Sequence, residues 1–285
     1  MLQRNSKVDV TLWQPGQEAF PGYRLVQKLG QGDAGEVWEA KRPDNSLVAL
    51  KFITFSDLKD AAAEIKTLEN ICRIHHANLI EILGVWSVPG GLLLSMDRAD
   101  GSLQDLVDLS MQEYGTGLEG ELVIQYLRQV AEVLDFLNSP VHRLVDGRIV
   151  GFQHCNIKPS NLLLFGDTVK ISDLGLASSF SIPSHRKLTN LDYAAPEVYQ
   201  GKFSNHIDQY ALALTYATLR LGKLPFPSTG NNLRGSWPRR RPKADLSALS
   251  EEEQNVLNRA LAMAPGERWK SCKELIMQLD FALSR

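Results

Sequence analysis

The spacing of apolar residues changes about a third of the way along the chain. Three segments after Tyr23, YRLVQKLG, GEVWEAKR and SLVALKFI, alternate apolar and polar residues between Gly, Pro, Asp or Asn, which predicts three strands of an antiparallel meander. An amphipathic helix over 57–74 and two more strands, around LIEILGVW and GLLLSMD, follow. After residue 100 the pattern is mostly helical. The sequence therefore predicts an α+β protein of two lobes.

The predicted domains are an N-terminal extension over residues 1–20, a strand-rich lobe over 21–99 and a helical lobe over 100–285. The 31 basic and 33 acidic residues are well mixed and give a net charge of -2, so we expect no nucleic-acid partner. No apolar stretch approaches the roughly 18 residues of a membrane span. Three cysteines without metal-like spacing fit a reducing compartment. We expect a cytoplasmic protein with no membrane segment in this chain.

A glycine-rich segment, LGQGDAGEV, lies between the first two predicted strands. Gly30, Gly32 and Gly35 follow the pattern G-x-G-x-x-G, and Val37 comes two places later. These glycines could simply make a hairpin turn. A dinucleotide-binding turn would lead into a helix, whereas here both flanks are strands. A glycine hairpin of this kind lets backbone amides approach phosphate oxygens closely.

Two charged residues follow in positions that suit a phosphate site. Lys51 on the third strand could be a solvated lysine, or its ammonium could reach phosphates beneath the glycine loop. Glu64 on the following helix is a plausible ion partner for Lys51, although it could also be an exposed helix charge like Glu69. Leu68 lies four places after Glu64, at helical spacing, so Glu64 sits beside the apolar face and is favoured over Glu69.

A polar constellation lies far downstream in the helical lobe. HCNIKPSN ends at Asn161 and precedes the strand-like LLL, and KISDLGLA then supplies Asp173. An asparagine and an aspartate separated by a short hairpin offer two oxygen ligands for Mg²⁺ bridging nucleotide phosphates.

These segments together resemble the protein kinases over residues 22–282. The sequence of residues 154–177 is most similar to that of bacterial kinases of the eukaryotic type. The resemblance implies a bilobal fold with an antiparallel five-stranded sheet and one helix in the N-lobe, a mostly helical C-lobe, and ATP with Mg²⁺ or Mn²⁺ as cofactors. Lys158 is typical of the serine/threonine class, which implies a protein substrate. Two structural features are implied as well: a buried ion pair between Glu197 and Arg268, and a carboxylate, Asp208, that anchors the catalytic loop.

The resemblance also assigns the site residues. The implied nucleotide-binding set is Gly30, Gly32, Gly35, Val37, Ala49 against adenine, Lys51 paired with Glu64, the gatekeeper Met96, the hinge backbone of Asp97 and Ala99, and Leu163 as the floor. The implied metal ligands are Asn161 and Asp173, and the implied catalytic residues are Lys51, Glu64, Lys158 and the residue at position 156.

The sequence departs from the family pattern in the catalytic loop. Asn156 stands where the catalytic aspartate is expected, and Cys155 stands where an arginine precedes it. Asn190 occupies a position where threonine is common, and Leu174 replaces the phenylalanine of DFG. Asp146 cannot substitute for the missing aspartate, because it lies fifteen residues before Asn161 and the motif requires five. An insertion before His154, forming a surface loop, explains that segment better.

Three hypotheses follow from the carboxamide at position 156. A carboxamide is neutral and its oxygen is not usefully basic, so the general base is absent. The chain is therefore expected to be a pseudokinase that binds ATP and Mg²⁺ and signals through docking or conformation. It could instead be a slow serine/threonine kinase with Lys158 and the metals carrying the transfer, or an active kinase into which Asn156 was introduced by engineering.

Overall fold

The computed structural model describes residues 13–32, 35–54, 65, 68–88, 90–173, 178–179, 192–226 and 242–284. The chain divides into two compact units. The first comprises Met1–Cys72 and Ile80–Ala99, and the second comprises Arg73–Leu79 and Asp100–Arg285. Among the described residues, no helix is both long enough and apolar enough to cross a membrane.

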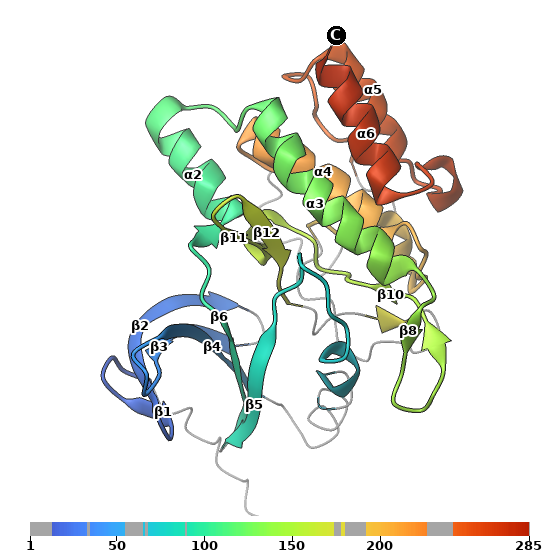
Figure 1. Cartoon of the computed structure of the whole chain (residues 1–285). Coiled ribbons are helices and arrows are strands. Elements are labelled where there is room, and N and C mark those ends of the chain that lie inside the picture. The colour runs from blue at the N-terminus through green and yellow to red at the C-terminus, as the bar shows by residue number, and fades with distance from the viewer. Residues whose placement is uncertain are drawn as a thin grey trace, which may run out of the picture. The chain divides into compact units, whose positions relative to one another are not determined.

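The first unit is built on an antiparallel sheet in the order β1-β2-β3-β4-β6-β5, drawn in blue to cyan in Figure 1. Its strands are β1 (Glu18–Phe20), β2 (Tyr23–Gly32), β3 (Gly35–Lys41), β4 (Leu47–Thr54), β5 (Ile82–Val88) and β6 (Gly91–Asp97). The five predicted strands are all present. Of the helix predicted over 57–74, the structure describes residue 65 and residues 68–71 as helical, and Glu64 lies outside the described residues.

The sixth strand, β1, comes from the segment expected to be an N-terminal extension. Glycines with positive φ follow Pro15 and Pro21; the first turn precedes β1, and the second, between β1 and β2, brings β1 back against β2. Phe20 stacks on Trp86 with ring centroids 4.6 Å apart, and Trp13 packs on Phe52 at 5.7 Å. Residues 13–20 of the extension are thus part of the sheet and pack against its core, which alternation alone could not show for a strand of three residues.

One face of the sheet carries the apolar core of the first unit. The cluster consists of Leu25, Trp38, Ala40, Val48, Leu50, Phe52 and Leu93. Because side chains alternate across a strand, the residues between these, including Glu39, Ala49 and Lys51, lie on the opposite face.

The second unit is mainly helical. Its helices are α2 (Leu103–Tyr114), α3 (Gly120–Asn138), α4 (Ile207–Leu221), α5 (Glu251–Ala260) and α6 (Cys272–Leu283). In α4 every residue from Ile207 to Leu219 is buried, and the helix lies against α2, α3, α5 and α6. A helix buried on all sides serves as the central support of its unit.

Short strands complete the second unit near the predicted constellation. The strands β7 (Gly101–Ser102), β11 (Leu162–Phe165) and β12 (Thr168–Ile171) form one sheet, and β10 (Phe152–Gln153) pairs with β13 (Ser178–Ser179). The last turn before β11 is a 3-10 helix, η1 (Pro159–Asn161).

The insertion predicted as a surface loop is a hairpin of β8 (His142–Arg143) and β9 (Ile149–Val150), seen in yellow-green in Figure 1. It is anchored more firmly than a loop, because His142 and Leu144 are buried. The ring of His142 stacks edge-on against Phe136 of α3, and its Nε2 bonds the Phe136 carbonyl at 2.9 Å. At the hairpin tip, Asp146 is exposed and pairs with Arg148 at 2.7 Å.

Candidate active site

A buried carboxylate on α4 holds the backbone of the segment between β10 and η1. Asp208 accepts a hydrogen bond from the backbone N–H of His154 at 2.6 Å and another from Cys155 at 2.8 Å. Asp208 is completely buried, and this burial raises its pKa to about 6, against the two N–H donors, which lower it. The predicted anchoring contact is confirmed, and it fixes the backbone directly before Asn156.

His154 connects Asn156 to Ser172, the residue between β12 and Asp173. Its Nε2 lies 2.9 Å from the Ser172 carbonyl, and its Nδ1 lies 3.2 Å from the backbone N–H of Asn156. Since a carbonyl only accepts and an N–H only donates, the ring must be the neutral tautomer with the proton on Nε2. Burial lowers the pKa of His154 to about 4, which is consistent with this neutral form. His154 is not among the predicted site residues, although its place two residues before Asn156 in the loop motif was a signal.

Asn161 closes the loop from the other end. Its side-chain Nδ2 donates to the Asn156 carbonyl at 2.8 Å, and its own carbonyl accepts from the Ser172 N–H at 2.9 Å and the Ser172 hydroxyl at 3.1 Å. With the amide nitrogen of Asn161 engaged in this way, its amide oxygen is the atom left to bind other groups. Asn156, Asn161 and Ser172 are therefore one hydrogen-bonded unit.

Two residues of the site adopt unusual backbone conformations. Cys155 has φ 64° and Asp173 has φ 66°, both in the left-handed region; aspartate enters this region more readily than most residues, whereas cysteine rarely does. Such conformations persist where surrounding contacts enforce them, and they cluster at functional sites. For Cys155 the enforcing contacts include the hydrogen bond to Asp208. Leu174 and Asn190 lie outside the described residues.

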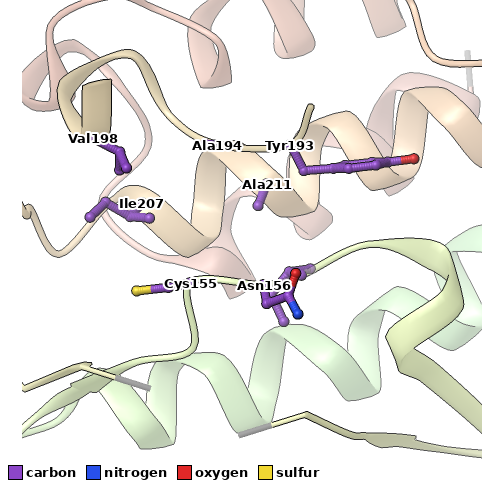
Figure 2. A pocket seen from close by; sticks show the side chains of 8 residues that line it. Cys155, Asn156, Tyr193, Ala194, Val198, Ile207 and Ala211 are labelled. Carbon is purple, nitrogen blue, oxygen red and sulfur yellow. The ribbon is translucent and has the colours of Figure 1, made fainter. Parts of the chain in front are cut away.

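A small cavity of about 10 Å³, space for roughly one water molecule, lies beside the loop. Figure 2 shows it between Cys155 and Asn156 on one side and Tyr193, Ala194, Val198, Ile207 and Ala211 on the other. The Cys155 thiol lies toward the Val198 and Ile207 end, and the Asn156 carboxamide lies beneath Tyr193. The guanidinium expected at position 155 is thus replaced by a small thiol beside mostly apolar side chains.

A buried ion pair stabilises the segment that contributes Val198 to the cavity. Arg268 donates from its two terminal nitrogens to the two oxygens of Glu197 at 2.8 and 2.7 Å, and the pair is almost completely buried. The predicted Glu197–Arg268 pair is therefore confirmed. The Arg268 guanidinium, together with Ser204, lowers the pKa of Glu197 although burial opposes this.

The predicted metal ligands suit a hard cation that needs few protein ligands. Asn161 offers an amide oxygen and Asp173, half-buried, offers a carboxylate. Within the described part of the chain, no three His, Cys, Asp or Glu side chains cluster as a metal cage. Mg²⁺ commonly binds through one or two protein oxygens plus substrate phosphates, so this donor set fits Mg²⁺ or Mn²⁺ held together with a nucleotide. Lys158, half-buried, directly precedes η1 in the same loop. Leu163 of β11 lies opposite Lys170 of β12.

The remaining predicted residues that the structure describes lie in the first unit, on β2, β3, β4 and β6 and directly after β6. Gly30 lies opposite Val37 and Gly32 opposite Gly35 in the β2–β3 hairpin, while residues 33–34 lie outside the described residues. Lys51 lies opposite Val37, and Ala49 lies opposite Met96. Asp97 ends β6 and Ala99 follows two places later.

The two outer glycines of the loop have different structural constraints. Gly35 has φ 138°, and a Cβ there would collide with the carbonyl oxygen of Phe52. Gly30 has no atom within 4 Å of the position a Cβ would take. The fold therefore requires glycine at position 35, whereas nothing in the described neighbourhood requires it at position 30.

The protein kinase domain family matches residues 23–280. The chain belongs to the protein kinase family. Serine/threonine-protein kinase PknF of Mycobacterium tuberculosis is 28% identical over 286 residues, which cover 93% of this kinase chain and 57% of PknF. Cell division control protein 2 homolog 3 of Trypanosoma brucei brucei is 28% identical over 219 residues, covering 74% of the chain and 66% of that protein. The chain spans a little over half the length of the first of these relatives.

Solved structures show the same relationship for this kinase domain. The PknI kinase domain of Mycobacterium tuberculosis is similar with a TM-score of 0.72 and 25% identity, over 96% of this chain and 100% of that one. A double mutant of the same domain gives a TM-score of 0.71 and 26% identity, over 95% and 99% of the two chains. The predicted α+β bilobal kinase fold is confirmed, as is the similarity to bacterial serine/threonine kinases.

Proposed function

We propose that this kinase domain binds ATP with Mg²⁺ or Mn²⁺ and transfers phosphate slowly or not at all, so that its main activity is pseudokinase signalling by conformation or docking to a protein partner. The observation that carries the proposal is the loop around Asn156. Asp208, His154 and Asn161 hold its backbone through a continuous set of hydrogen bonds. The side chain presented there is a carboxamide, so the loop is positioned without a general base.

Nucleotide binding is supported separately by features of each unit. In the first, a glycine hairpin, Ala49 and Lys51 share one region of the sheet. In the second, Asn161 and Asp173 offer oxygens that suit Mg²⁺. The bound ion would neutralise charge on the phosphates, and the residues of this chain would orient it. Leu163 and the backbone of Asp97 and Ala99 would bind the base, with Met96 as gatekeeper.

The expected loss of rate follows from the missing base. General-base catalysis contributes about 10² to 10⁴ in rate. Kinases turn over about 1 to 100 times per second, so about 10⁻⁴ to 1 per second would remain. The rate need not fall to zero, because phosphoryl transfer depends mainly on positioning and charge stabilisation.

A slow serine/threonine kinase is the second candidate. The observation that favours it is Lys158 in the same fixed loop as Asn161. Such an enzyme would phosphorylate a narrow set of protein substrates. Long incubation with labelled ATP and Mg²⁺ or Mn²⁺ distinguishes the candidates, because loss of all transfer with retained ATP binding would exclude the enzyme.

Nucleotide binding is tested by thermal unfolding with and without ATP and Mg²⁺. A ligand at 100 times its Kd stabilises the folded state by about 2.7 kcal/mol, so we expect a clear upward shift in Tm. Asp173→Asn should remove most of the Mg²⁺-dependent shift. Asp167→Asn is the matched control, because Asp167 is exposed in the turn between β11 and β12 and its replacement changes the charge equally. An unchanged Tm for the unaltered chain at millimolar ATP would contradict the proposal.

A further inference from the structure

An ion pair between a buried carboxylate and a partly exposed guanidinium in the first unit connects β3 to the residue that follows β6. Glu39 is 4% exposed, and its Oε2 lies 2.7 Å from Nε of Arg98. The other carboxylate oxygen accepts a hydrogen bond from Gln27 on β2 at 3.3 Å. The carboxylate is thus engaged from both sides, which is how a buried charge is normally tolerated.

The strand register places this carboxylate among the residues expected to bind adenine. Gln27 lies opposite Glu39, Glu39 opposite Ala49, and Ala49 opposite Met96. Residues directly opposite each other in an antiparallel sheet point to the same face. Glu39 therefore shares a face with Ala49 and Met96, opposite the face of the apolar core cluster.

Arg98 lies between the two residues whose backbone is expected to contact the base. Asp97 is the last residue of β6, Arg98 follows, and Ala99 comes next. A side chain that reaches from this segment back to β3 limits how the segment can move or rotate. Since the hinge bonds to adenine come from backbone groups, a displacement of a few tenths of an ångström in this segment would weaken them.

We propose that Arg98 and Glu39 are positioning residues for the hinge, setting adenine affinity by holding the backbone of Asp97 and Ala99 without contacting the nucleotide. This inference rests on the proposed nucleotide binding. The ion pair preorganises the binding segment, so that less ordering remains when ATP binds. A purely structural ion pair would stabilise the fold and leave nucleotide selectivity unchanged.

The test compares Glu39→Gln, Arg98→Gln and the double variant with the unaltered chain. Calorimetric titration with ATP and with GTP, each with Mg²⁺, is done well below the unfolding temperature of every variant. We expect ATP affinity to fall about tenfold in each single variant, equivalent to about 1.4 kcal/mol. Guanine carries the reverse donor and acceptor at the hinge edge, so GTP affinity should change less than about twofold. The double variant should be no weaker than either single one, because both changes remove the same contact.

Arg220→Gln is the matched control. It removes another ion pair of a buried carboxylate with a partly exposed guanidinium, that of Arg220 on α4 with Glu253 on α5 at 3.1 Å. Both residues lie in the second unit, and neither is among the predicted site residues. We expect its ATP and GTP affinities to match those of the unaltered chain.

The outcomes distinguish failure of this inference from failure of the proposed nucleotide binding. Unchanged ATP affinity in folded variants, or equal losses for ATP and GTP with a lowered Tm, would overturn the positioning of the hinge by this pair. Failure of the unaltered chain to bind ATP would overturn the proposed function and this inference with it. If Glu39→Gln does not fold, Arg98→Lys serves instead, because lysine keeps the positive charge but lacks the guanidinium Nε that contacts Glu39. A threefold or greater loss of selectivity for ATP over GTP would support the inference. Unchanged selectivity would overturn it.

Discussion

His154 shows how much one buried side chain contributes to the loop. It lies completely inside the second unit and connects the Asn156 N–H to the Ser172 carbonyl. A charged imidazole would have no acceptor for the proton on Nδ1, because that nitrogen faces an N–H. The neutral ring is therefore part of the architecture that aligns Asn156 with the residue before Asp173.

We predict that His154 stays neutral in the folded protein down to about pH 4. Two-dimensional NMR spectra of the imidazole nitrogens and carbons, recorded between pH 4 and 8, should show the proton on Nε2 and no titration of this ring above pH 5. A ring that becomes charged near pH 6.5 would contradict the neutral tautomer.

The same residue gives a prediction for stability against pH. Because the folded pKa of His154 is lowered from 6.5 to about 4, its contribution is present above pH 6.5 and is lost as the pH falls through 4. Asp208 acts in the opposite sense, since its pKa is raised from 3.8 to about 6 and its contribution is lost as the pH rises through 6. The destabilisation caused by His154→Gln, measured by urea unfolding, should therefore grow between pH 4 and 6.5. A loss that shrinks over this interval would contradict the assignment.

Helix α4 acts as the support from which the loop is positioned. Its burial along thirteen consecutive positions from Ile207 to Leu219 makes it a rigid base, and Asp208 in its first turn carries the loop backbone. We predict that Asp208→Asn lowers the free energy of unfolding by about 1 to 3 kcal/mol, because the new amide NH₂ would face a buried backbone N–H.

The matched control for Asp208→Asn is Asp245→Asn. Asp245 is exposed and accepts from the N–H and hydroxyl of Ser247 in a turn. Water can replace these bonds, so urea unfolding should show a much smaller change. Equal losses in the two variants would mean that the buried position of Asp208 is not what matters.

The β2–β3 hairpin separates a glycine required by the fold from one that is not. We predict that Gly35→Ala destabilises the protein by about 1 to 3 kcal/mol, because the added Cβ meets the Phe52 carbonyl oxygen. Gly30→Ala should leave the unfolding midpoint nearly unchanged, because the space around it is open, while lowering ATP affinity. Denaturant unfolding of both variants tests this, and similar midpoints for the two would contradict it.

The molecule as a whole was largely predictable where the pattern is periodic. Alternation predicted the five long strands, because such strands bury one face over many residues, and the pattern after residue 100 indicated a mostly helical lobe. The loop contacts of Asp208 and the pair of Glu197 with Arg268 followed from the kinase resemblance.

Other features lie beyond what local sequence can specify. Strand β1 has three residues, too few for a periodic signal, and its place depends on packing of Phe20 and Trp13 against distant aromatics. The pairing of Arg98 with Glu39 joins positions 59 residues apart and needs the strand register. The left-handed backbone at Cys155 arises from tertiary contacts, since cysteine itself disfavours that conformation.

The most direct test of the central claim is the single-turnover rate of phosphate transfer to a basic serine/threonine peptide, measured for the unaltered chain and for Asn156→Asp. The new carboxylate would take the position that the loop already holds, so we predict a rate increase of about 10² to 10⁴ with ATP affinity unchanged within about twofold. Asn45→Asp, the same chemical change in an exposed turn, should have no effect. Equal rates for the unaltered chain and Asn156→Asp would contradict the claim that position 156 limits catalysis.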